Sequence, residues 1–286
     1  MKKIIIGILL VFICNVGVYA ATSGTTATTS TTNWNSTAAI NRVNTIGKKL
    51  IAANGIGQNI TFKVSDQADV NAYANINKEV YVYRGLLEYV SNDEELAAVI
   101  SHELGHILNG HCAKQGVLNT GVNILANATA KATGSTLAAG VGQQLVSSKL
   151  SRKDEFEADI TGVDIMTKAG YNPLAMISVL NKICGNYIDI LQTHPSGEKR
   201  LLNIYDYVEY NYPAKLKTGF KSDSYSKALT LLTPTVQKRK SSEKLTKKYE
   251  KEQKKLLAKK EKRMAKAAKT STIWDGYYTT LQLMAQ

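Results

Sequence analysis

The sequence predicts an α+β fold that is mainly helical and contains a small β-sheet. Apolar residues recur with helical spacing in several parts of the 286-residue chain, whereas segments 60–64 and 79–83 have the pattern or composition of strands. Hydrophobic residues make up 44% of the chain, which is enough for a buried core and excludes a wholly disordered protein. Three cysteines are too few for a disulfide scaffold.

The first expected elements are a helix and two strands. Ser36 or Thr37 is expected to cap the helix. Its apolar face consists of Ile40, Val43, Ile46 and Leu50. Ile60–Val64 alternates between apolar and polar residues, as a half-buried strand does. Glu79–Tyr83 is rich in valine and tyrosine, which favours a second strand.

The later elements are expected to be helices. Residues 91–94 (Ser-Asn-Asp-Glu) have the form of a capping box with Ser91 as the cap, and Gly110 is expected to end the helix that they begin. Its apolar side consists of Leu96, Val99, Ile100, Leu104 and Ile107. Further helices are expected over 151–169, over 173–184 and after Pro195. Residues 116–148 are dominated by small residues and favour a helical hairpin.

The N-terminus has the features of a secretory signal peptide. Two lysines precede the apolar run 4–13, and small residues at positions 18 and 20 suit a cleavage site. Ten apolar residues are too few to span a bilayer, which needs about 20. We therefore expect residues 1–20 to direct export, so that the protein is periplasmic or secreted. The Thr/Ser-rich residues 21–35 are expected to form a linker.

Export would place two cysteines, Cys112 and Cys184, in a compartment where disulfides persist. The sequence leaves two alternatives open for them. They either pair with each other or lie separately as small buried side chains.

The positive charge of the chain is concentrated near its C-terminus. The formal net charge is +13, and residues 238–269 hold 15 basic and 4 acidic side chains. The remaining body is close to neutral, which excludes a uniformly basic nucleic-acid-binding domain, and we expect no nucleic-acid partner. We expect 213–235 to be a linker and 236–286 to be a basic helical extension.

This extension has more than one possible role. It is expected to be a solvated helix or, alternatively, to contact an anionic membrane or an envelope polymer through residues 238–286 and so associate the protein with the membrane. An aromatic face near the C-terminus is expected to dock on the body of the protein. It consists of Trp274, Tyr277, Tyr278 and Leu281.

The motif His102-Glu103-Leu104-Gly105-His106 lies within one expected helix. Residues four positions apart leave the same helix face, so both imidazoles can reach one metal ion. Zinc bound there activates a water molecule, and the neighbouring Glu103 carboxylate is placed to accept its proton. The pattern therefore predicts a catalytic zinc site.

A zinc site needs a third protein ligand. The candidates are His111, Glu155, Glu157, Asp159 and His194. His111 is nine residues from His102, about 180° around the helix axis, which argues against it. Glu155 and Asp159 share one face of the helix expected over 151–169. On the residues alone, this acidic run is equally a solvated helix start.

Five segments follow one another with a spacing that resembles the HtpX/CAAX-prenyl-protease family of zinc metallopeptidases, particularly its soluble envelope members of the BepA and LoiP type. These segments are Asn71–Ala74, Tyr81–Leu86, Glu95–His106, Ser151–Gly162 and Thr193–Arg200. The resemblance covers roughly residues 36–212. It implies a zincin-like catalytic domain of the gluzincin type over that range.

The resemblance also implies a role for each site residue. One zinc ion is held by His102, His106 and Glu155. Glu103 acts as the general base, and Asp159 holds a ligand imidazole. His194 approaches the metal, where it stabilises the oxyanion or occupies the open coordination position of a latent state. Arg200 is expected to anchor the loop that carries His194 through an ion pair.

The function implied is that of an exported zinc metalloendopeptidase acting on unfolded or misassembled envelope proteins. Two alternatives stay open: a latent or chaperone-like binding protein with a structural zinc, and an envelope tether that works through residues 238–286. One departure concerns residues 76–79 (Ile-Asn-Lys-Glu), where relatives often carry a glycine pair. If 79–83 is the edge strand that aligns an extended substrate, the residues that lead into this strand differ from those of relatives.

Overall fold

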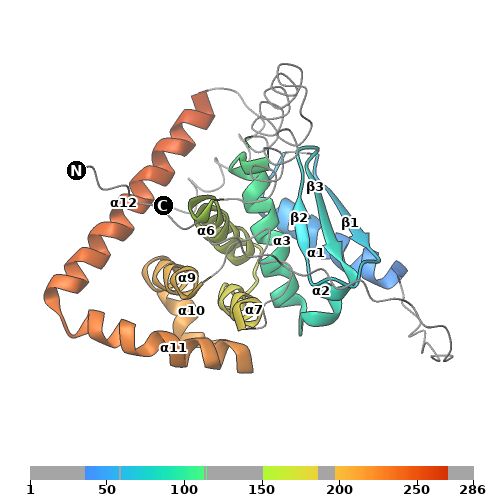
Figure 1. Ribbon diagram of the computed structural model, residues 1–286. Helices are drawn as coiled ribbons and strands as arrows, with labels where there is room; N and C mark the ends of the chain where they lie inside the picture. The colour runs from blue at the N-terminus through green and yellow to red at the C-terminus, as the bar shows by residue number, and fades with distance from the viewer. Residues whose placement is uncertain (1–35, 58, 113, 115–150, 186–196, 270–286) are drawn as a thin grey trace, which may run out of the picture. The chain divides into compact units, whose positions relative to one another are not determined.

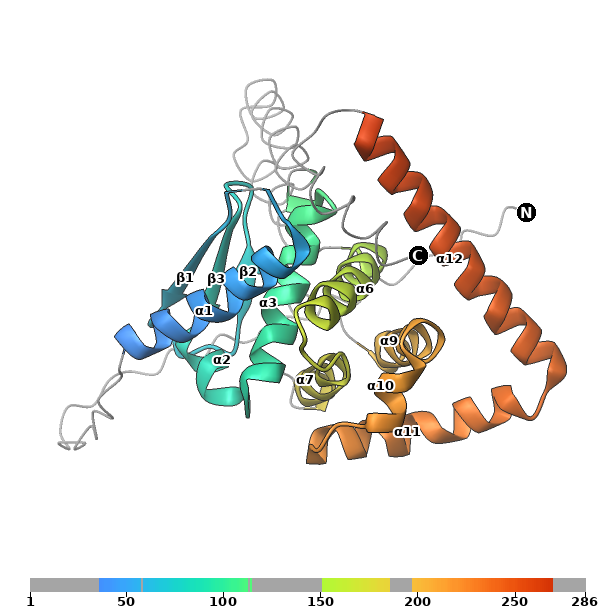
Figure 2. The same cartoon turned by 180° about the vertical axis from the view of Figure 1, so that it is seen from behind.

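A computed structural model, drawn in Figure 1 and from behind in Figure 2, describes residues 36–57, 59–112, 114, 151–185 and 197–269. Several expected features lie outside the described residues. These are the signal peptide 1–20, the linker 21–35, the hairpin 116–148, His194 and the aromatic face 274–281. Within the described ranges, no helix combines the length and apolarity that crossing a membrane requires.

The described residues form a mainly helical α+β fold with one three-stranded sheet, which confirms the predicted fold class. The N-terminal elements are α1 (Ser36–Asn54), β1 (Thr61–Ser65), β2 (Ala72–Ala74), β3 (Glu79–Tyr83), α2 (Arg84–Tyr89) and α3 (Asp93–Leu108). The later helices are α6 (Arg152–Lys168), α7 (Leu174–Gly185), α9 (Glu198–Asn211), α10 (Pro213–Thr218), α11 (Asp223–Lys240) and α12 (Glu243–Lys269).

The sheet has the strand order β1–β3–β2, with β1 parallel and β2 antiparallel to β3. The strand expected over Glu79–Tyr83 is present as β3, but it is not an edge strand, because it has a partner on each side. The edge next to α3 is β2, for which no strand was expected. Three residues are too few to show the alternation by which a strand is recognised in a sequence.

The β2–β3 hairpin closes without the glycine pair. Lys78 adopts a left-handed conformation, with φ of 61°, in the turn where relatives often carry glycine. The side-chain oxygen of Asn75 accepts hydrogen bonds from the backbone N–H groups of Asn77 and Glu79. This asparagine-based turn stabilises the hairpin locally.

Two details of the expected helices need correction. The cap of α3 is Asn92, not Ser91: its side chain accepts a hydrogen bond from the Glu95 N–H, and the Glu95 carboxylate accepts one from the Ser91 N–H. The Glu95 carboxylate thus binds the N–H of the residue before the cap, so the reciprocal box expected at Ser91 is not formed. In α1, Ile40 is 42% exposed, although the other three residues of the expected apolar face are buried.

The helix α3 packs closely against α6, and the two lie side by side in both Figure 1 and Figure 2. Two glycines allow this approach. A Cβ atom on Gly105 would lie 2.5 Å from the backbone oxygen of Ala158. A Cβ atom on Gly162 would lie 3.0 Å from the backbone nitrogen of His102. Close packing of two backbones brings side chains of α3 and α6 into contact.

Replacing Gly105 with alanine is expected to destabilise the protein by about 1–3 kcal/mol, the usual cost of overpacking. The added methyl group meets a backbone atom that a change of rotamer cannot move away. Urea unfolding measures the effect. Gly57→Ala is the control, because nothing lies within 4 Å of a Cβ atom there. Equal stability of both variants and the parent would contradict the close approach of the helices.

The segment 213–235, expected to be a linker, is instead helical. It contains α10 and most of α11, and α11 packs against α7. Its buried residues recur at helical spacing and include Tyr225, Ala228 and Leu232, a periodicity that the expectation of a linker overlooked.

The basic helix α12 contacts α6 and α9 rather than being wholly solvated. Lys259 and Arg263 form ion pairs with Glu157 of α6, and Lys260 pairs with Asp164 of the same helix. The Tyr249 hydroxyl donates a hydrogen bond to the backbone oxygen of Asp206 in α9. One face of α12 is therefore held by the body, while many of its other lysines are exposed.

Candidate active site

Three buried side chains converge where α3 meets α6. His102 and His106 lie one turn apart on α3, with 3.0 Å between their Nε2 atoms. Glu155, in the first turn of α6, places Oε2 3.4 Å from His102 Nε2 and Oε1 3.3 Å from His106 Nε2. The two histidine nitrogens thus face each other, and Glu155 turns one oxygen towards each of them; all three residues are at least nine-tenths buried.

The spacing of these atoms fits a zinc ion. Zinc bonds of about 2.0–2.1 Å in a tetrahedral site place neighbouring ligand atoms about 3.3 Å apart. The three separations, from 3.0 to 3.4 Å, lie close to that value. Two imidazole nitrogens and one carboxylate are also the donor set of catalytic zinc sites that leave a fourth position open.

The charges around the site also fit a divalent cation. Three carboxylates, those of Glu103, Glu155 and Asp159, are buried in this region together with one guanidinium, that of Arg200. Without a metal, His102 takes up part of the imbalance: burial lowers its pKa, but the bonds to Asp159 and Glu155 outweigh this and raise the pKa to about 10. Protons and a metal ion would therefore compete for this ring.

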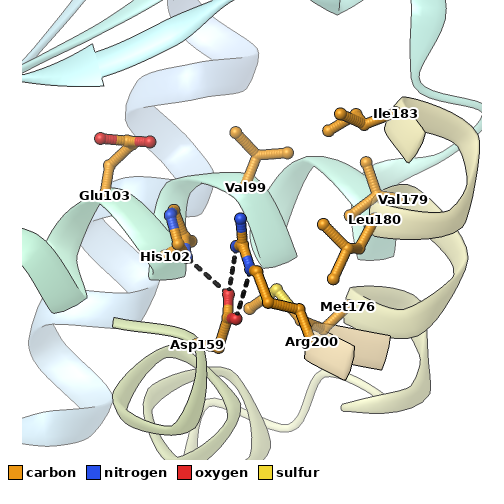
Figure 3. Close-up of a pocket in the computed structure, with 9 residues that line it drawn as sticks. All are labelled: Val99, His102, Glu103, Asp159, Met176, Val179, Leu180, Ile183 and Arg200. Carbon is orange, nitrogen blue, oxygen red and sulfur yellow. Dashed lines mark hydrogen bonds and ion pairs between the residues drawn. The ribbon is translucent and has the colours of Figure 1, made fainter. Parts of the chain in front are cut away.

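Asp159 lies between His102 and Arg200 and interacts with both, as Figure 3 shows. Asp159 Oδ1 lies 2.9 Å from His102 Nδ1, the nitrogen that faces away from the other ligands. Arg200 donates to both oxygens of Asp159, at 2.8 and 2.7 Å, and its Nη1 lies 2.9 Å from Glu155 Oε2. Burial alone would raise the pKa of Asp159. The Arg200 charge and the hydrogen bond with His102 together outweigh burial, so that the pKa lies below its usual range.

Glu103 lies on α3 beside His102 but is not part of the cluster formed by His102, His106 and Glu155. Its side chain is 1% exposed, and Figure 3 shows its carboxylate next to the His102 ring on α3. Glu103 and His102 line one end of a pocket whose far side is apolar. The apolar lining consists of Val99, Met176, Val179, Leu180 and Ile183.

His111 lies much closer to the site than the helical arithmetic indicated. The helix α3 ends at Leu108, and Gly110, with φ of 72°, turns the chain back. His111 Nδ1 then lies 3.0 Å from His106 Nδ1, and its Nε2 lies 3.5 Å from Glu157 and 3.7 Å from Asp154. Counting 100° per residue fails once the helix has stopped; the Gly110 stop signal was the available clue.

Cys112 does not supply a nucleophile at this site. Burial and the charge of Glu103 raise the pKa of its thiol to about 12, so that it is protonated at neutral pH. The thiol is free and half-buried, and Sγ lies 3.6 Å from the Ala74 oxygen in β2. The Cys184 side chain lies outside the described part of the chain.

Six of the seven expected site residues meet at the α3–α6 junction. They are His102, Glu103, His106, Glu155, Asp159 and Arg200. The seventh, His194, belongs to a segment outside the described residues. Glu157, the remaining acidic candidate, turns towards His111 and α12 instead of the ligand cluster.

Curated proteins similar to this chain are proteases by name, and some of them are named as metalloproteases. The chain is 32% identical to "Metalloprotease LoiP" of Escherichia coli over 160 residues, 52% of this chain and 63% of that protein. It is 29% identical to the "Beta-barrel assembly-enhancing protease" of Yersinia pestis over 180 residues, covering 56% and 37%. It is 34% identical to "Mitochondrial metalloendopeptidase OMA1" of Arabidopsis thaliana over 141 residues, covering 48% and 29%.

These matches span less than two thirds of each relative's length. The family comparison is broader, because the model described as "Peptidase family M48" matches residues 38–208, more than half of the chain. That range contains every residue of the converging cluster on α3 and α6. The chain therefore belongs to peptidase family M48.

Proposed function

We propose that the protein is a zinc-dependent endopeptidase. The observation that carries this proposal is the convergence of His102, His106 and Glu155 at tetrahedral spacing, with Glu103 beside them on α3. A bound zinc ion supplies Lewis-acid chemistry, polarising the scissile carbonyl and acidifying a water molecule. Loss of casein cleavage on chelation, and its return with zinc, tests the proposal.

The general base is Glu103. It accepts the proton of the attacking water and delivers it to the nitrogen of the departing amine, the two halves of general acid–base catalysis. Asp159 keeps the His102 ring oriented so that Nε2 faces the metal, and Arg200 holds Asp159 in place. With Asp159 and Arg200 holding the ligand residues in place, proton transfer is assigned to Glu103.

His194 is proposed to stabilise the oxyanion. The support is the resemblance of the His-Pro segment to the family motif. His194→Phe should lower kcat by about 10²–10³, the cost of losing one oxyanion-hole donor, while zinc content stays constant. A faster variant would instead assign His194 to the latent state, in which the ring occupies the metal.

The apolar pocket beside Glu103 is proposed to hold an apolar side chain of the substrate. Burial of a large aliphatic or aromatic side chain contributes about 1.5–3 kcal/mol, a preference of roughly 10- to 150-fold. The edge strand β2, next to α3, is placed to align the substrate backbone by strand addition. The preferred substrates are then extended, unfolded segments with exposed apolar residues.

Leu180→Gln should reduce this preference by about 10-fold, because the amide makes the pocket polar. Two peptides are compared, one with Leu and the other with Ser beside the scissile bond. The measurement is the ratio of their kcat/KM values. This ratio is independent of the fraction of folded enzyme. Ile76→Gln, at a residue 58% exposed and outside the pocket lining, should leave the ratio unchanged. An unchanged ratio in Leu180→Gln would remove the pocket from substrate selection.

The substrates are proposed to be unfolded or misassembled envelope proteins, with the protein exported to that compartment. Two observations support this: the signal-like residues 1–20, and the relatives whose name refers to assembly of β-barrels. Mass spectrometry of the mature protein tests export, since the proposal predicts that the chain begins after Ala20. An intact N-terminus on the protein recovered from cells would contradict it.

The exposed face of α12 is proposed to contact an anionic membrane surface or envelope polymer. After Lys259, Lys260 and Arg263 are paired with the body, the helix still exposes many unneutralised lysines. Each lysine near an anionic surface contributes about 1 kcal/mol at low ionic strength. Co-sedimentation with anionic vesicles should be strong at low salt and weak at high salt; no binding at low salt would exclude this role.

A further inference from the structure

His106 makes contacts through both of its ring nitrogens. Nε2 faces His102 and Glu155, where the metal ion is proposed to bind. Nδ1, on the opposite side of the ring, lies 3.0 Å from His111 Nδ1. A ring that offers its Nε2 lone pair to a metal carries its proton on Nδ1, so His106 donates this hydrogen bond and His111 accepts it.

The second nitrogen of His111 then carries a proton and faces carboxylates. His111 is 4% exposed, and its Nε2 lies 3.5 Å from Glu157 Oε2 and 3.7 Å from Asp154 Oδ1. These two negative charges favour the tautomer with the proton on Nε2. That tautomer leaves Nδ1 as the acceptor that His106 requires.

Glu157 is in turn held by α12, which lies outside the range of the family match. Lys259 Nζ lies 2.7 Å and Arg263 Nη1 2.8 Å from its two carboxylate oxygens. Arg263 also donates to the side-chain oxygen of Asn109, the residue that caps the end of α3. The basic helix therefore contacts both the carboxylate behind His111 and the end of the active-site helix.

A second metal ion at His111 is the competing interpretation, because His111, Asp154 and Glu157 bring three potential ligand atoms within 4.8 Å of one another. Charge argues against it. Lys259 and Arg263 already neutralise Glu157, and Lys114 lies 3.2 Å from Asp154. A second cation would have to displace these side chains, whereas the His111 ring already lies among them.

We propose that His111 positions the His106 ring for the metal, and that α12 stabilises this arrangement through Glu157. His111 is thus a positioning residue, and the C-terminal extension is coupled to the metal centre over a chain of three contacts. The inference depends on metal binding by His106 but not on peptide hydrolysis. Metal-binding measurements without substrate therefore test it separately from the proposed function.

The first test compares two substitutions of His111. In His111→Asn, the side-chain oxygen lies at about the position of Nδ1 and can accept the hydrogen bond from His106. In His111→Leu, the side chain has no acceptor. Competition with a chromophoric chelator should show zinc affinity lowered about 10- to 100-fold in His111→Leu and largely restored in His111→Asn. The visible absorption bands of the cobalt-substituted protein should shift in the leucine variant only. Equal affinity and spectra in both would overturn the proposal.

The second test changes only α12 and does not depend on His111→Leu folding. The double variant Lys259→Met/Arg263→Met should lower zinc affinity several-fold, up to about 10-fold, and shift the cobalt bands in the same direction. Lys254→Met/Lys255→Met removes the same charge from exposed positions of α12 and should match the parent. Identical behaviour of the two double variants would overturn the coupling. Two equivalents of tightly bound metal in the parent would establish the second site instead.

Discussion

Replacing Glu103 with glutamine is expected to abolish peptide hydrolysis while the metal stays bound. Glutamine has nearly the same shape as glutamate but cannot accept the proton of the attacking water. The loss should be at least the 10²–10⁴-fold that general acid–base catalysis contributes. Because Glu103 lies outside the cluster of three ligand atoms, zinc content should stay at about one per chain. Cleavage of casein and zinc analysis of the same preparation measure both effects.

A matched control for this substitution is Glu88→Gln. Glu88 is 55% exposed and pairs only with Arg84 among the described contacts, so its loss should change neither stability nor rate appreciably. Full activity in Glu103→Gln would refute the proposed base. A Glu103→Gln protein without zinc would show that Glu103 is a ligand, which its position beside the cluster argues against.

Replacing Glu155 with alanine is expected to remove the metal. Its two oxygens lie 3.4 and 3.3 Å from the two histidine nitrogens, and no other carboxylate among the described residues completes this cluster. The affinity for zinc should fall by more than the roughly 10- to 100-fold that loss of a residue behind a ligand costs. Competition with a chromophoric chelator gives the affinity, and activity should disappear with the metal.

Glu157→Ala provides the contrast within the same helix. It removes a carboxylate two residues away that faces His111 and α12. At saturating zinc this variant should still bind one ion per chain. Its zinc affinity should fall only by the smaller amount expected when His111 loses its contact with Glu157. If Glu157→Ala loses the metal and Glu155→Ala keeps it, the ligand assignment is wrong.

The parts of the site that follow from local helical geometry could be predicted from the sequence. His102 and His106 share a face because they lie four residues apart, and the same spacing brings Glu155 and Asp159 to one side of α6. The identity of the partner helix came from the family resemblance, since nothing in an acidic helix start distinguishes a ligand from a solvated residue.

The parts that depend on contacts distant in sequence could not be predicted in this way. The central place of β3 depends on β2, whose three residues carry too little pattern to recognise. His111 returns to the site because the helix stops at Leu108 and the chain turns at Gly110, which helical arithmetic does not include. The docking of α12 depends on ion pairs about a hundred residues apart, and a lysine-rich sequence alone looks the same whether paired or solvated.

The most direct test of the central claim is the cleavage of unfolded casein by the purified protein before chelation, after chelation and after zinc is restored. The account predicts that cleavage stops when the metal is removed and returns with about one equivalent of zinc per chain. Cleavage that continues unchanged in the metal-free protein would contradict the proposed zinc peptidase. So would the absence of cleavage in a protein that holds one zinc ion, because that result would leave the metal with a structural role alone.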